Sequence, residues 1–150
     1  MSNNRLITDE IHARLERDDR IPHPAEVAVS ERHGTVILRG SVGTLHQRRA
    51  IVKIARAVAG VLAVEDELWV DPRDRWQDNE VRGAALQALM SNDAVPADRV
   101  DVTVSNGWLT LRGEVKHQYE NDAAFEAVHR LPGVGGITNE IKLITAGIGG

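Results

Sequence analysis

The sequence predicts an α+β protein made of two tandem units, each with the element order α-β-β-α-β. In each unit we expect a three-stranded sheet with two helices packed on one face. Three observations predict this fold: the chain repeats itself, each half begins with apolar residues at helical spacing, and each half continues with the alternation of half-buried strands.

The internal repeat is visible when the sequence is shifted by 73 residues. Leu38-Arg39-Gly40 then falls on Leu111-Arg112-Gly113, and Gly60-Val61 falls on Gly133-Val134. Chance similarity would not keep this register over so long a stretch. We therefore divide the chain into unit one, a linker, unit two and a flexible tail, at residues 5–70, 71–77, 78–144 and 145–150.

Each unit begins with a predicted helix that ends before a proline, Pro22 or Pro96, because proline disfavours helical geometry just upstream. Asp78 is the expected N-cap of the helix in unit two. The apolar stripes are Ile7, Ile11 and Leu15 in unit one and Val81, Ala85 and Leu89 in unit two.

A β-hairpin follows each first helix. Asn106-Gly107 is a strong signal for a two-residue turn and His33-Gly34 is a weaker one, since both residues of such a turn take positive φ. The return strands carry Gly40 and Gly113 on the face patterned as core. We expect these glycines to allow close approach of a helix to the sheet.

A second helix is expected over 45–58, with Thr44 and Gln47 forming a capping box. Gly60 and its counterpart Gly133 then lead into the last strand. The core positions of this helix are Ile51, Ile54, Ala55 and Val58 in unit one, and Ala124, Ala127, Val128 and Leu131 in unit two.

Two spaced patterns resemble the BON domain, a family named for bacterial osmotically inducible and nodulation proteins. They are Val-x-Val-x-x-Gly-x-Leu-x-Leu-x-Gly-x-Val at 102–115 and Leu-Pro-Gly-Val followed by Asn-x-Ile at 131–141. Unit one departs from them at Glu31 and at Ala59, which stands where unit two has Pro132. The resemblance implies a non-catalytic, phospholipid-interacting or envelope-associated module linked to osmotic and envelope stress.

The residues offer no organised chemistry, so we expect no enzyme activity, no cofactor and no metal site. None of the five serines lies in a Gly-x-Ser-x-Gly turn, and the six histidines lack metal-ligand spacing. A net charge of −4 and 3% aromatic residues argue against nucleic-acid binding. The first residues lack an apolar signal core, which predicts a cytoplasmic protein, or a periplasmic one if a signal has been removed.

One surface stands out by its charge. Arg49, Lys53 and Arg56 recur on one face of the helix at 45–58, and Arg48 flanks them. Basic helical faces attract anionic lipid headgroups. The matching helix of unit two is acidic instead, and the alternative is a solvated face that pairs with neighbouring acids.

Apolar residues on the other sheet faces are the second anomaly, because an uncovered apolar patch commonly marks an interface. The interface candidates are Ile37, Trp69, Trp108 and the linker residue Trp76. The two units could pack these faces together, or a second chain could cover them. Trp76 could dock the units or anchor the chain to a membrane.

The expected function is therefore peripheral binding to an anionic phospholipid surface through Arg48, Arg49, Lys53 and Arg56. The alternatives are a scaffold that binds a protein partner or itself through the sheet faces, and a sensor of a small ligand or ion.

Overall fold

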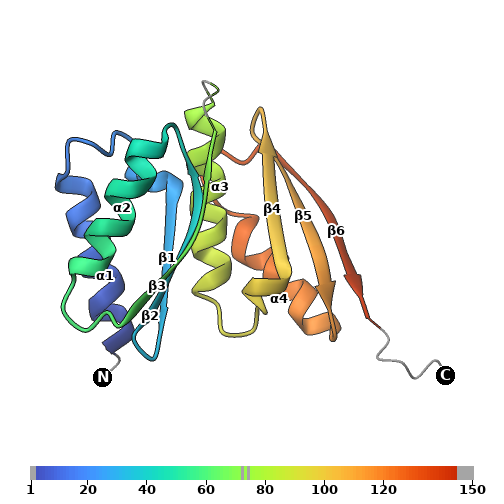
Figure 1. The fold of residues 1–150 in the computed structure, drawn as a ribbon. Coiled ribbons are helices and arrows are strands. Elements are labelled where there is room, and N and C mark those ends of the chain that lie inside the picture. Colours follow the sequence, from blue (N-terminus) through green and yellow to red (C-terminus); the bar gives the residue numbers. More distant parts are fainter. Residues whose placement is uncertain (1–2, 72, 74, 145–150) are drawn as a thin grey trace.

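The computed structural model describes residues 3–71, 73 and 75–144, and the predicted tail at 145–150 lies outside them. It confirms the α+β fold with two repeated units (Figure 1). Unit one consists of α1 (Asn3–Arg17), β1 (Val27–Arg32), β2 (Thr35–Val42), α2 (Leu45–Ala57) and β3 (Ala63–Val70). Unit two consists of α3 (Trp76–Met90), β4 (Val100–Ser105), β5 (Trp108–Val115), α4 (Gln118–Val128) and β6 (Gly136–Leu143).

Both sheets have the same topology, with the second strand in the centre. β1 pairs antiparallel with β2 and β3 pairs parallel with β2, and unit two repeats this order with β4, β5 and β6. The parallel pairing arises because the second helix of each unit crosses over the sheet. Both predicted hairpin turns are confirmed, since His33 and Asn106 have φ of 54° and 51° and each is followed by a glycine of positive φ.

Each unit has an aliphatic core between its sheet and its two helices. In unit one the stripes of α1 and α2 meet the inner faces of β1 and β2, and Ile11, Leu15, Leu38 and Ile51 are fully buried. Burying such a side chain stabilises the fold by about 1.5–3 kcal/mol. The core of unit two also takes in Ala28, which lies on the outer face of β1 in unit one. The two units therefore share packing.

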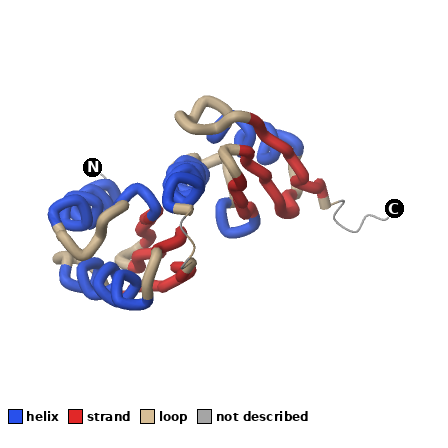
Figure 2. Tube along the Cα trace, turned by 90° about the horizontal axis from the view of Figure 1, so that it is seen from above, coloured by secondary structure: helices blue, strands red, loops and turns tan. Residues whose placement is uncertain are grey.

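Helix α3 produces this shared packing. Figure 1 shows α3 between the two sheets, and Figure 2 shows it from above at the centre of the molecule. One side of α3 packs on the sheet of unit two, and the opposite side covers β1 and β2 of unit one. The two sheet faces thus do not pack on each other, because a helix lies between them.

Two local predictions were wrong. Asp78 does not cap α3, which begins earlier, at Trp76. Its carboxylate instead accepts hydrogen bonds from the backbone N–H groups of Asn106 and Gly107, at 2.8 and 3.0 Å, and so holds the hairpin turn. Gly40 does not make room for either of the two predicted helices of unit one: a Cβ there would collide with the backbone carbonyl of Glu26, in the short 3-10 helix Pro24–Glu26. A Cβ at Gly113 would likewise collide with the backbone carbonyl of Arg99.

Candidate functional site

The basic face of α2 is fixed by how this helix begins. The Thr44 hydroxyl accepts the Gln47 N–H at 3.1 Å, as the capping box predicts. The Gln47 side chain accepts from the Gly43 N–H at 3.0 Å, one residue before the position that the box requires. With Ala50, Ile51 and Ile54 buried against the sheet, the cations of α2 lie on its solvent side.

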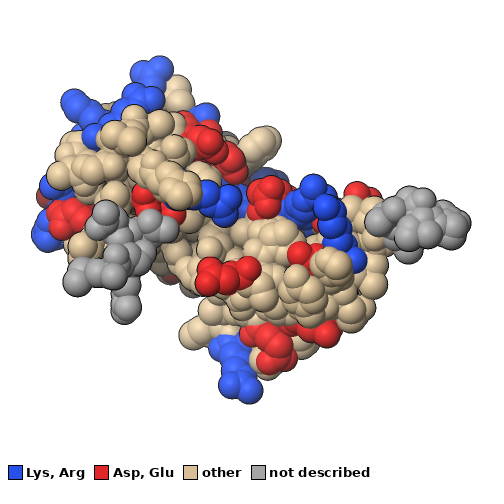
Figure 3. All heavy atoms as spheres, turned by 90° about the horizontal axis from the view of Figure 1, so that it is seen from below, with Lys and Arg blue, Asp and Glu red and all other residues tan. Residues whose placement is uncertain are grey.

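The structure places all four predicted lipid-contact residues along this helix. Arg48 donates from Nε to Asp66 on β3 at 2.9 Å, so its charge is partly used within the fold. Arg49, Lys53 and Arg56 are exposed, and no acidic side chain in the described part of the chain forms an ion pair with them. Figure 3 shows Lys and Arg side chains gathered at one corner of the molecule.

A shallow groove of about 460 Å³ runs along this face, lined by Leu45, Arg48, Arg49, Val52, Lys53, Arg56 and Asp66. Leu45 is 49% exposed although it is a large apolar residue. The groove thus combines three open cations with an apolar side chain in the first turn of the helix. This arrangement suits contact with a phosphate-bearing, partly apolar surface.

The predicted interface residues have different environments. Ile37 is half-buried on β2, whereas Trp69 on β3 and Trp108 on β5 are 68% and 52% exposed. The Trp108 indole donates from Nε1 to the Thr138 hydroxyl at 2.8 Å, which fixes the ring on the sheet of unit two. Trp76 stacks on His23 of unit one, with ring centroids 4.5 Å apart, and so lies between the units.

Helix α3 provides the contacts between the units that sequence reasoning missed. The Gln87 amide lies against the free edge of β1, accepting from the Val29 N–H at 2.9 Å and donating to the Val29 carbonyl at 3.0 Å. Arg82 donates to the Val102 carbonyl at 2.7 Å and to the Ser41 hydroxyl at 3.1 Å. One helix therefore forms hydrogen bonds with the backbone of Val29 on β1 in unit one and of Val102 on β4 in unit two.

Acidic residues converge where α3 meets unit one. Glu26 is buried, and burial together with the nearby carboxylates of Glu80 and Asp71 raises its pKa to about 7. Burial also acts to raise the pKa of Asp71, but hydrogen bonds from Arg73, Arg75 and Asn79 outweigh it and hold that pKa below its usual range. His23 lies 3.2 Å from Glu80, from Nδ1 to Oε2.

Two other kinds of site are absent from the described residues. No group of three or more His, Asp or Glu side chains there is placed to hold a metal ion. None of the helices in that part of the chain has the length and apolar character needed to cross a bilayer.

Comparison with known proteins gives one family and several relatives. A family model described as "BON domain" matches residues 3–72 and 77–145. Osmotically-inducible protein Y of Escherichia coli (strain K12) is 31% identical over 145 residues, covering 91% of this chain and 70% of that protein.

Solved structures of low identity were also found. A structural protein of the type III secretion system of Chlamydia trachomatis is 15% identical, with a TM-score of 0.42, covering 97% of this chain and 65% of that one. A C-terminal domain of that protein is 12% identical, with a TM-score of 0.40, covering 91% of this chain and 96% of the domain. This chain thus spans just under two thirds of the longer structure.

Proposed function

The chain belongs to the BON domain family, and from this premise we propose that it is a non-catalytic tandem BON module that binds anionic membrane surfaces peripherally. Unit one makes the contact, through the basic face of α2. The E. coli relative is named for osmotic induction, which supports a role in the response to osmotic or envelope stress.

The observation that carries this proposal is the set of three open cations on α2. Arg49, Lys53 and Arg56 have no acidic partner among the described residues, so their charge is available to a phosphate surface. Each cation near an anionic bilayer contributes about 1 kcal/mol, and the attraction falls off within a Debye length. Binding through this face is therefore weak and sensitive to salt, with Leu45 adding apolar contact.

Unit two differs at the matching surface. Its second helix, α4, carries Glu120, Asp122 and Glu126, so an anionic membrane would repel it. The two units share a fold but have opposite charge on this helix. The proposal therefore assigns membrane contact to unit one alone, which gives the experiment a built-in control.

The test is flotation with phosphatidylglycerol vesicles and with phosphatidylcholine vesicles, at low and at physiological salt. The variant R49E/K53E/R56E should lose binding to the phosphatidylglycerol vesicles. Arg48 is left unchanged because a glutamate there would face Asp66. The matched control is K116E/R130E/K142E, which makes the same change of charge at exposed residues of unit two.

We expect the wild type and the unit-two control to float with phosphatidylglycerol at low salt and with neither vesicle at high salt. Both variants should keep the wild-type circular dichroism spectrum. If the two variants lost binding equally, total charge and not the α2 face would be responsible. Wild-type binding that survives in R49E/K53E/R56E would contradict the site.

A protein-interaction role is the second candidate, favoured by the outer face of the sheet in unit two. In unit one α3 covers the matching face of β1 and β2, whereas in unit two Thr103, Trp108 and Arg112 are exposed. This candidate gains support if neither vesicle binds and sedimentation shows self-association of the chain.

A further inference from the structure

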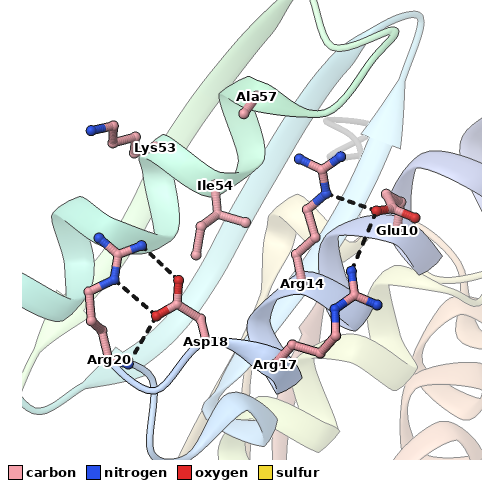
Figure 4. Close-up of a pocket in the computed structure, with 8 residues that line it drawn as sticks. All are labelled: Glu10, Arg14, Arg17, Asp18, Arg20, Lys53, Ile54 and Ala57. Atoms are coloured by element: carbon pink, nitrogen blue, oxygen red, sulfur yellow. Dashed lines mark hydrogen bonds and ion pairs between the residues drawn. The ribbon is translucent and has the colours of Figure 1, made fainter.

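A second groove lies on the other side of α2, between α1 and α2 (Figure 4). Its volume is about 570 Å³. Figure 4 shows Arg14 and Arg17 of α1 and Arg20 of the loop that follows α1 around it, with Lys53 of α2 at its edge. The lining residues are Glu10, Arg14, Arg17, Asp18, Arg20, Lys53, Ile54 and Ala57.

Two carboxylates hold two of the guanidinium groups in place. Arg20 donates to Asp18 from Nε at 2.9 Å and from Nη2 at 2.7 Å, and these bonds lower the pKa of Asp18 to about 2. Arg14 donates from Nε to Glu10 at 2.8 Å, which lowers the pKa of Glu10. Both carboxylates are therefore ionised at neutral pH and act as positioning groups for the arginines.

The remaining donors of the groove are available to a ligand. In the described ranges Arg17 forms one ion pair, with Glu10 at 3.9 Å, and Lys53 forms none. Arg14 uses its Nε on Glu10, and its terminal nitrogens have no hydrogen-bond partner among the residues that the structure describes. Four cations and two carboxylates give the groove a formal charge of +2.

We propose that this groove binds a phosphate monoester, carried by a lipid headgroup or by a small free molecule. A phosphate monoester has a charge of about −1.5 to −2 at neutral pH, which matches the charge of the groove. Arginine forks bind such oxygens through paired, charge-assisted hydrogen bonds. A phosphodiester carries one negative charge and would leave one cation of the groove unbalanced.

Ile54 and Ala57 add an apolar side to the groove, so the carbon atoms next to the phosphate have a surface to contact. The lipid form of this proposal rests on the membrane binding proposed above and deepens it by naming the headgroup. The form with a free ligand stands independently of membrane binding.

The first experiment uses the full chain and free ligands in isothermal titration. Glycerol 3-phosphate is the monoester, dimethyl phosphate is the diester and glycerol is the uncharged control. The variant R14Q/R17Q removes two cations of the groove between α1 and α2. The variant R49Q/R56Q removes two cations from the basic face of α2. Lys53 lines both grooves and is left unchanged. Glutamine keeps a helix propensity close to that of arginine.

The second experiment compares vesicles that contain phosphatidic acid with vesicles that contain phosphatidylglycerol, at equal surface potential. We expect the wild type to prefer the phosphatidic acid vesicles. R14Q/R17Q should lose this preference and keep its binding to phosphatidylglycerol. R49Q/R56Q should bind both vesicles less and keep the preference.

In solution, R14Q/R17Q should bind glycerol 3-phosphate about tenfold more weakly or worse. Binding of the free monoester without vesicle binding supports the groove and contradicts the membrane proposal. A preference for phosphatidic acid without free-ligand binding supports the lipid source.

The groove proposal is overturned if the wild type distinguishes neither monoester from diester nor one vesicle from the other. It is also overturned if R14Q/R17Q behaves as the wild type does. If that double variant unfolds, Arg17→Gln alone replaces it, since the Arg17 side chain is 70% exposed and its one ion pair within the described residues is the 3.9 Å contact with Glu10.

Discussion

At Gly83 the docking of α3 on unit one depends on the absence of a side chain. A Cβ there would collide with the backbone carbonyls of Ala25 and Glu26, and these atoms have no rotamer by which to move away. Alanine would favour the helix by about 1 kcal/mol, but overpacking costs about 1–3 kcal/mol. We expect Gly83→Ala to lower the free energy of unfolding by about 1 kcal/mol in urea titrations.

The matched control for that substitution is Gly43→Ala, at the start of α2. A Cβ at Gly43 would meet only the Gln47 side-chain oxygen, at 3.4 Å, and that group can shift. Its effect should be within about 0.5 kcal/mol, as for most surface changes. Equal losses in the two variants would show that the close approach at Gly83 is not what the substitution disturbs.

For single residues, the sequence predicts the role of those whose contacts lie nearby in the chain. The turns at His33-Gly34 and Asn106-Gly107 follow from positive φ alone, so they could be foreseen. Gly83 could not be, because its counterpart in unit one is Asp9, and only the backbone of the other unit explains a glycine there. Glu31 was a visible departure from the strand pattern, but the structure was needed to show its carboxylate bonded to the Gly34 N–H.

At the scale of secondary-structure elements, helix α3 covers the edge of β1 through Gln87. A free sheet edge exposes unpaired backbone groups, and the Gln87 amide pairs with both groups of Val29 as another strand would. Gln87→Met keeps the length of the side chain and removes both hydrogen bonds to Val29, together with those to His12 and Ser91. We expect a loss of about 1–3 kcal/mol, since two partly buried backbone groups lose their partners.

Hydrogen exchange gives this prediction a local readout. The Val29 amide should exchange faster in Gln87→Met, while the Leu38 amide in the neighbouring strand should change less. Gln77→Met, at an exposed position of the same helix, is the control and should alter neither rate. An unchanged Val29 rate would mean that this edge is protected by packing rather than by the amide.

Element prediction succeeded where a helix has one buried face. The stripes of α1 and α2 are visible in the sequence because their other faces are polar, and the capping residue Thr44 marks where α2 begins. α3 is buried on two sides, so its second contact surface of Gly83, Leu86 and Gln87 does not stand out from its first. The basic face of α2 was found by its charge, whereas the groove beside it was missed because Arg14 and Arg17 lie on another helix.

For the whole molecule, the repeat predicted two units of one fold but not how they pack. The residues that both units share form the core of each unit. The contacts between the units are made by residues that differ between the two copies. Arg82 and Gln87 of α3 correspond to Thr8 and Ala13 of α1, so only the second copy can bridge two sheets in this way. We therefore expect the two units to unfold together as long as α3 remains packed on both sheets.

The stability of this docked body should depend on pH through Glu26. Its pKa of about 7 lies above the value of 4.5 for an ordinary glutamate, because the carboxyl is buried and faces Glu80 and Asp71. The folded chain therefore holds this proton more tightly than the unfolded chain does. The resulting stability is complete below about pH 4.5 and is lost as the pH rises through about 7, an effect of up to about 3 kcal/mol.

Glu26→Gln tests this dependence because glutamine is neutral at every pH and nearly isosteric with the protonated acid. In urea titrations the variant should match the wild type at pH 4 and exceed it by roughly 2–3 kcal/mol at pH 8.5, where the wild type buries a third negative charge beside Glu80 and Asp71. His23 lies 3.2 Å from Glu80, so Glu26→Gln/His23→Gln should also be compared with His23→Gln. The wild type is compared with Glu26→Gln, and His23→Gln with the double variant. If the free energy of unfolding changes with pH equally within each comparison, the carboxyl of Glu26 is not the group that couples docking to pH.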